Sequence, residues 1–189
     1  MRQLLPAILL LPLIACGPVS PSVSLPFDAV QGGQDPTRAA IYSSSYAFNN
    51  PGGLADPAVA ARAAANLEYL AINLPQDPRY SFTPTLAGQM ATARDEMHAA
   101  LGVAPTAGPQ AVVDGLYGAS RALNRRDTRS ATEALPPAAF PNSAVTLARL
   151  SAMGPLPFSA AATAQAEREQ LRFEQERQND NSGGASGRP

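Results

Sequence analysis

Apolar side chains recur every three or four residues over much of the chain, which is the spacing of one face of an α-helix. The clearest stripe comprises Val59, Ala63, Leu67, Leu70 and Leu74. It follows a start signal at Asp56 and Pro57 and ends at Pro75. Aspartate caps a helix, while proline fits the first turn of a helix but not its interior. A helix is therefore predicted over residues 57–74.

Two further stripes predict the next helices. The first comprises Leu86, Met90, Ala93, Met97 and Leu101. The second comprises Val112, Leu116, Ser120 and Leu123. These helices are predicted to begin at Pro84 and Pro109, and Gly102 is a natural end for the first of them because glycine favours the position after a helix. Gly115 and Gly118 inside the second helix indicate that a neighbouring helix approaches it closely.

Residues 36–48 fit two kinds of structure. On a helix, one face would carry Ile41, Ser45 and Phe48. On a strand, one side would carry Tyr42, Ser44, Tyr46 and Phe48. Asp35 and Pro36 repeat the helix start signal, so the cap favours a helix, and the strand stays open as the alternative.

Two short helices are predicted after residue 129. Ser130 and Glu133 have the spacing of a capping box, in which each side chain accepts the backbone N–H of the other residue. Asn142 then precedes an apolar run that ends near Met153. Both segments are closed by prolines or by a glycine and a proline, which end helices.

The last predicted helix covers residues 160–178 and is capped by Ser159. Its second half consists mainly of glutamate and arginine, with charge pairs three and four residues apart. That pattern predicts a solvated helix that such pairs support. Residues 179–189 are rich in glycine, serine and asparagine and are predicted to form a disordered tail.

The N-terminus reads as a targeting segment followed by a linker. Arg2 precedes an apolar run over residues 4–14, which is shorter than the roughly 20 residues needed to cross a bilayer. Its length and charge match a signal peptide, predicted over residues 1–15. Residues 16–34 contain several prolines and glycines, so a flexible, solvated tether is predicted there.

The end of the apolar run consists of Leu13, Ile14, Ala15 and Cys16, and it resembles the lipobox of bacterial lipoproteins. That resemblance implies a diacylglyceryl group on the Cys16 thiol, cleavage before Cys16 and acylation of the new amino group. Cys16 is the only cysteine of the chain. Gly17 stands where the enteric sorting pattern places aspartate, which favours the outer over the inner membrane. The domain would then face the periplasm.

Composition narrows the class of protein. Hydrophobic residues make up 45% of the chain, but many are alanine, aromatics make up 6%, and there is no tryptophan. We expect a modest core of closely packed helices. The net charge is −1, which argues against nucleic-acid binding because that function needs a strongly basic face.

Candidate chemistry is sparse. With one histidine and no free thiol, neither a metal site nor another cofactor is predicted. His98 follows Asp95 by three residues, so the two could form an acid/base pair. The simpler interpretation places His98 near a helix C-terminus, where a partial positive charge is favourable.

One charged surface is predicted. Arg121, Arg125 and Arg129 are four residues apart and share a helix face if the helix continues past Asp127. Such a stripe would contact anionic lipid headgroups or an acidic partner. The alternative is a helix C-terminus that carries favourable cations.

Together these patterns predict a single all-α domain over residues 35–178, an irregular bundle of five or six helices. The preferred function is that of a membrane-anchored envelope lipoprotein with a non-catalytic interaction or structural role. One alternative is a carrier that holds a small apolar ligand in a cavity between helices. Another is an enzyme that uses His98.

Overall fold

The structure is a computed structural model that describes residues 22–30, 34–78 and 84–183. Within these ranges the chain forms seven α-helices, one short 3-10 helix and no strand, so the all-α prediction is confirmed. The elements are α1 (Pro36–Asn49), α2 (Pro57–Asn73), η1 (Leu74–Gln76), α3 (Pro84–Leu101), α4 (Pro109–Asn124), α5 (Thr128–Glu133), α6 (Ser143–Ser151) and α7 (Pro157–Gly183). Six α-helices precede the last one, as the predicted bundle required.

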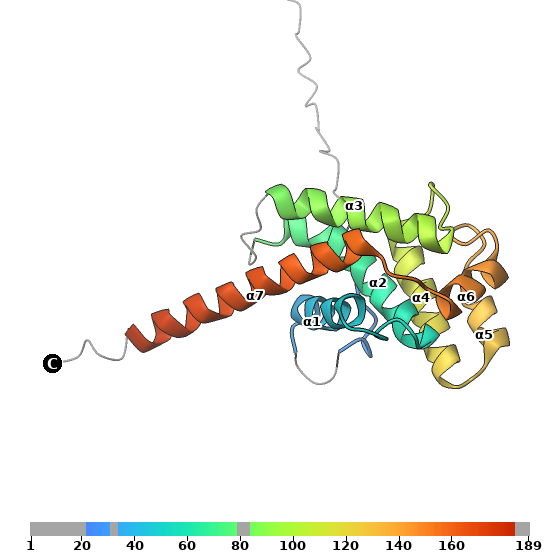
Figure 1. Cartoon of the computed structure of the whole chain (residues 1–189), viewed down its shortest axis with the longest axis horizontal. Coiled ribbons are helices and arrows are strands. Elements are labelled where there is room, and N and C mark those ends of the chain that lie inside the picture. Colours follow the sequence, from blue (N-terminus) through green and yellow to red (C-terminus); the bar gives the residue numbers. More distant parts are fainter. Residues whose placement is uncertain (1–21, 31–33, 79–83, 184–189) are drawn as a thin grey trace, which may run out of the picture.

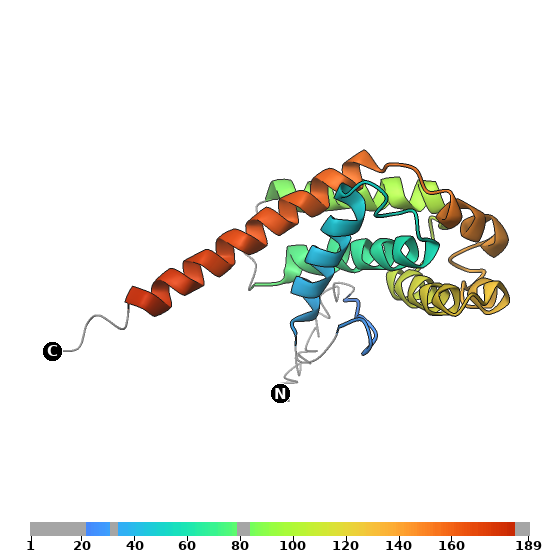
Figure 2. The ribbon, with the colours of Figure 1, turned by 60° about the horizontal axis from the view of Figure 1, so that its bottom comes forward.

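Helix α2 lies at the centre of the bundle. It packs against α1, α3, α4 and α6. Most of α7 lies along α3 and α1, and its last turns extend away from the body (Figure 1, Figure 2). Helices α4, α5 and α6 gather at the opposite end of the molecule (Figure 1).

The central place of α2 follows from its side chains. Leu67 and Leu70 are fully buried, and the alanines around them let neighbouring helices approach closely. Met90 and Met97 of α3 are also fully buried. The two predicted apolar stripes are therefore core faces.

Helix α1 settles the ambiguity of residues 36–48. The Asp35 side chain accepts hydrogen bonds from the backbone N–H groups of Thr37 and Arg38, at 2.9 and 3.1 Å. Ile41 faces the core and is fully buried, whereas Tyr46 is 67% exposed. The cap satisfies two of the free N–H groups of the first turn, so the helix is favoured and the strand alternative is wrong.

The start of α5 lies before the predicted capping box. Asp127 is its N-cap, and one carboxylate oxygen accepts the Ser130 N–H at 3.0 Å. The other oxygen accepts the Ser130 hydroxyl at 2.5 Å, and this bond is the main reason that the pKa of Asp127 is lowered. Ser130 therefore sits inside the first turn, and its prediction as the cap was wrong because the carboxylate three residues earlier takes that place.

The start of α7 is also displaced, because its cap comes from another helix. The helix begins at Pro157, and the Glu96 carboxylate of α3 accepts the N–H groups of Phe158 and Ser159 at 3.1 and 2.8 Å. The Ser159 hydroxyl also donates to Glu96, at 2.8 Å. A carboxylate at a helix N-terminus is stabilised by the free N–H groups and the helix dipole. The sequence predicted Ser159 as the N-cap, and that prediction was wrong because Glu96 takes this role.

The end of α7 lies beyond the predicted boundary of the helical domain. The helix runs to Gly183, so residues 179–183 are helical and the predicted start of the tail at Asn179 was too early. Backbone hydrogen bonds within one helix need no tertiary partner, which lets the polar end continue. The remainder of the predicted tail, residues 184–189, lies outside the described residues.

The predicted solvated face of α7 is only partly solvated. Gln170 is buried, and the Ser45 hydroxyl of α1 donates to Glu167 at 2.5 Å. Further along, Glu174 accepts from Tyr42 at 3.2 Å and pairs with Arg38 at 2.9 Å. One polar face of the helix is thus packed against α1, which the local charge pattern does not reveal.

Candidate functional site

Cys16, the predicted acylation site, lies outside the described residues, as does the predicted signal peptide. The description begins at residue 22, within the segment predicted to be a flexible tether. Residues 22–30, which we call the strap, lie against the body on the side away from α3 and the start of α7 (Figure 2). Residues 22–30 of the predicted tether, residues 16–34, are thus docked on the body.

Side chains of α2 and α4 hold the first part of the strap. Asn73 of α2 accepts the Val23 N–H at 3.2 Å and donates to the Val23 carbonyl at 2.7 Å. Gln110 of α4 accepts the Ser24 N–H at 2.9 Å and donates to its carbonyl at 3.1 Å. The Val23 side chain is buried in the core. An amide side chain that pairs with both backbone groups acts like a neighbouring strand.

The far end of the strap is held by an ion pair. Arg121 of α4 donates from Nε to Asp28 Oδ2 at 2.6 Å and from Nη2 to Oδ1. Hydrogen bonding to Arg121 lowers the pKa of Asp28, and the same bonds raise the pKa of Arg121. This two-pronged geometry is the one that arginine and carboxylate favour. The Arg121 guanidinium also lies 5.9 Å from the centre of the Tyr117 ring.

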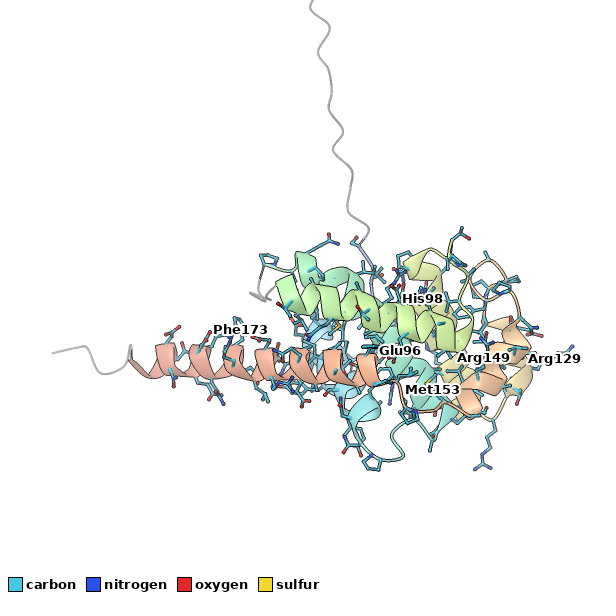
Figure 3. All side chains as sticks on the ribbon, turned by 45° about the horizontal axis from the view of Figure 1, so that its top comes forward. Glu96, His98, Arg129, Arg149, Met153 and Phe173 are labelled. Carbon is cyan, nitrogen blue, oxygen red and sulfur yellow. The ribbon has the colours of Figure 1, made fainter. Side chains whose placement is uncertain are left out.

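The three arginines of the predicted stripe do not share one helix face. Helix α4 ends at Asn124, Arg125 is its C-cap, and Arg126 has a positive φ of 59° that turns the chain away. Arg129 belongs to α5, pairs with Glu133 at 3.3 Å and lies at the outer edge of the molecule (Figure 3). The three arginines could share one face only on a helix that continues through Asp127. Asp127 instead caps α5, so the predicted stripe is wrong.

His98 has a partner that the sequence did not indicate. Its Nε2 lies 2.7 Å from Oε2 of Glu68, a fully buried residue of α2. Arg94, one turn earlier on α3, donates from Nε to both oxygens of Glu68 at 2.9 Å. Asp95, the partner of His98 in the alternative acid/base interpretation, is exposed. The three residues Glu68, Arg94 and His98 form a cluster that joins α2 to α3.

The chemistry open to this cluster is limited by its contacts. An ionised carboxylate only accepts hydrogen bonds, so the Nε2–Oε2 contact makes His98 the donor wherever Glu68 is ionised. The side chains of Arg94 and His98 are 25% and 15% exposed, respectively. Both donors are aimed inward at Glu68, so the cluster is built to neutralise a buried carboxylate. Figure 3 shows His98 on α3, the helix that also carries Glu96.

Sequence reasoning missed Glu68, Glu96 and Asp28. Glu68 had a usable signal, because α2 contains only two charged residues and Glu68 stands between the stripe positions Leu67 and Leu70. Its partners are 26 and 30 residues away, so no local spacing identifies them.

Clefts on the surface are open to solvent. One of about 370 Å³ is lined mainly by apolar side chains of α6 and of the segment between α6 and α7, beside Arg149. Another of about 480 Å³ lies next to the strap and is lined by Arg38, Tyr42 and Arg62, among others. The carrier alternative requires an enclosed apolar cavity, and these clefts do not have that form.

The described part of the chain contains no group of three or more His, Cys, Asp or Glu side chains arranged to hold a metal ion. Among the described helices, none combines the length and the hydropathy that crossing a bilayer requires. No family model, no curated protein and no solved structure matches the chain.

Proposed function

We propose that the chain is a lipid-anchored bacterial envelope protein whose helical domain has a non-catalytic interaction or structural role. The anchor rests on the resemblance of Leu13, Ile14, Ala15 and Cys16 to a lipobox. The strap is the structural observation that supports it. The segment that follows the acylation site is bonded to α2 and α4, so the domain is held close to its anchor.

The non-catalytic role is supported by the contacts of the interior charges. The Glu68 carboxylate is hydrogen-bonded to Arg94 and His98. The Glu96 carboxylate accepts hydrogen bonds from the first turn of α7. In both places a carboxylate joins two helices. A substrate that used His98 would have to displace a 2.7 Å contact with a fully buried acid.

The location follows from the anchor. Gly17 after the acylated cysteine favours the outer membrane, with the domain facing the periplasm. Two or more acyl chains hold a protein stably, because each buried methylene contributes about 0.8 kcal/mol. The partners are therefore the leaflet itself and either an envelope protein or anionic headgroups.

The test is expression of the full chain and of Cys16→Ser in a bacterial host. We expect the parent protein in the membrane fraction, with a mature N-terminus at residue 16 that carries acyl chains by mass spectrometry. Cys16→Ser should lose the acyl groups. A processed chain whose Cys16 carries no lipid would overturn the proposal.

A second variant tests the membrane assignment. In an enteric host, Gly17→Asp should move the protein from the outer-membrane to the inner-membrane fraction of a density gradient while leaving acylation intact. An unchanged distribution would show that position 17 does not decide the location.

A further inference from the structure

Phe27 is the most exposed large hydrophobic residue among the described residues, with 95% of its surface accessible. It lies in a turn of the strap that is closed by a hydrogen bond from the Ala29 N–H to the Pro26 carbonyl, at 2.9 Å. Single exposed apolar residues are common on proteins. Phe27 differs because it stands on a segment that is fastened to the body on both sides.

The fastening keeps the ring pointed outward. Before Phe27, Val23 is bonded to Asn73 and its side chain is buried. Directly after Phe27, Asp28 is paired with Arg121. The ring is therefore a fixed apolar projection on the face of α2 and α4 that carries the strap.

The chain length between the anchor and the strap places this face near the membrane. This step rests on the proposed function, in which Cys16 is acylated. Only residues 17–21 separate Cys16 from the first described residue, and six residues at an extended rise of at most about 3.6 Å each span at most about 22 Å. The strap face must then lie within that distance of the leaflet.

We propose that Phe27 inserts into the boundary between headgroups and acyl chains of the leaflet that holds Cys16, and that it thereby fixes which face of the domain turns to the membrane. Apolar side chains on a surface element bind at this depth. The carboxylate beside the ring would oppose approach to an anionic leaflet, but Asp28 is neutralised by Arg121. The start of α7 lies on the opposite side of the body and would face the periplasm (Figure 2).

Two features of the sequence allow a direct test. The chain has no tryptophan and a single cysteine, Cys16. Residues 16–189 can therefore be coupled through the Cys16 thiol to a maleimide lipid in phosphatidylcholine–phosphatidylglycerol vesicles. Phe27→Trp then places one fluorophore at the strap. Phe158→Trp, at a phenylalanine that is 58% exposed at the start of α7, is the matched control.

The measurement is tryptophan emission with and without bromine on the lipid acyl chains. We expect Phe27→Trp to shift to shorter wavelength on coupling and to be quenched several-fold more than Phe158→Trp. Circular dichroism of both variants should match the parent chain. Absent quenching at position 27, or equal quenching at both positions, would overturn the assignment of this face.

The two proposals fail separately. The maleimide lipid supplies the anchor in this experiment, so a negative quenching result overturns the role of Phe27 alone. Absence of acyl groups on Cys16 in cells overturns the proposed function, whatever the vesicles show.

Discussion

Oε2 of Glu68 lies 2.7 Å from Nε2 of His98, and the Glu68 side chain has no accessible surface. Arg94 lies on the other side of the same carboxylate, with Nη2 2.8 Å from Oε1. A buried carboxylate is tolerated only with such partners, because removing it from water costs several kcal/mol. The cluster therefore fixes α3 against α2 at one rotation.

Glu68→Gln should be strongly destabilising. The amide keeps the shape of the side chain but leaves Arg94 and His98 facing a neutral group, and breaking a buried pair in this way typically costs about 3–5 kcal/mol. The exposure of Arg94 places the expected loss at the lower end of that range. Urea unfolding measures it. Asp95→Asn, at an exposed position of the same helix, is the control and should leave the midpoint unchanged.

The buried hydroxyl of Tyr117 should make the domain less stable to unfolding at alkaline pH. Burial raises the pKa of its hydroxyl to about 12, and the hydroxyl donates to Asn66. The unfolded chain ionises this group near pH 10 while the folded chain keeps it neutral, so stability is lost as the pH rises from about 10 to about 12. A shift of this size corresponds to about 2–3 kcal/mol.

Tyr117→Phe should remove this part of the alkaline loss, although its stability at neutral pH falls because Asn66 loses a partner. Tyr46→Phe is the control, since that ring is 67% exposed, and its loss between pH 10 and 12 should equal that of the parent. Unfolding midpoints in urea across this pH range provide the measurement. An unchanged slope in Tyr117→Phe would contradict the prediction.

The parts of the fold that sequence reasoning reached are those set by local spacing. The stripe of Leu67 and Leu70 depends only on the helical period, and both residues are fully buried. The caps at Asp35 and Asp56 depend on a side chain and N–H groups two or three residues away. Such signals lie within one turn of chain, so the pattern contains them.

The features that sequence reasoning missed involve partners far along the chain. Ser159 was a reasonable local cap for α7, but Glu96 supplies the cap from 63 residues away. The composition of the strap suggested a linker, since no local pattern shows that its Val23 backbone pairs with Asn73. The rotation and placement of whole helices decide these contacts, and a one-dimensional pattern does not contain that information.

Gly115 and Gly118 illustrate a prediction that was right in kind and wrong in detail. A Cβ at Gly115 would lie 2.8 Å from Cδ of Pro136, and one at Gly118 would lie 2.9 Å from Cβ of Ala134. The close neighbour is therefore the end of α5 and the connection to α6, where a packed helix was predicted.

Gly115→Ala should destabilise the domain. Alanine favours a helix over glycine by about 1 kcal/mol, but overpacking against a rigid ring costs about 1–3 kcal/mol. Since Pro136 is held between α5 and α6, the packing term should dominate. Gly88→Ala on α3 is the matched control, because its Cβ meets nothing within 4 Å and the propensity gain should raise the thermal midpoint. A rise in both variants would mean that residues 134–140 move aside freely.

The strap should open when Asn73 is removed. Asn73→Ala deletes both hydrogen bonds to Val23, each of which contributes about 0.5–1.5 kcal/mol net. The polar contacts that remain are the exposed hydrogen bonds of Gln110 with the Ser24 backbone and the Asp28–Arg121 ion pair at the surface, where such pairs contribute about 0–1 kcal/mol. With so few contacts left, we expect amides of residues 22–30 to exchange hydrogen about tenfold faster or more, while those of α4 stay protected.

Arg121→Gln should have the same effect on a smaller scale, because it releases only Asp28. Arg129→Gln is the control, since Arg129 pairs with Glu133 and should leave the exchange of the strap unchanged. Hydrogen exchange read by mass spectrometry separates these segments. Unchanged exchange in Asn73→Ala would mean that burial of the Val23 side chain and the contacts of Gln110 and Arg121 hold the strap without Asn73. If the strap does open, the chain between Cys16 and the first fixed residue of the body more than doubles in length, and under the proposed anchoring the domain would no longer be held close to the membrane.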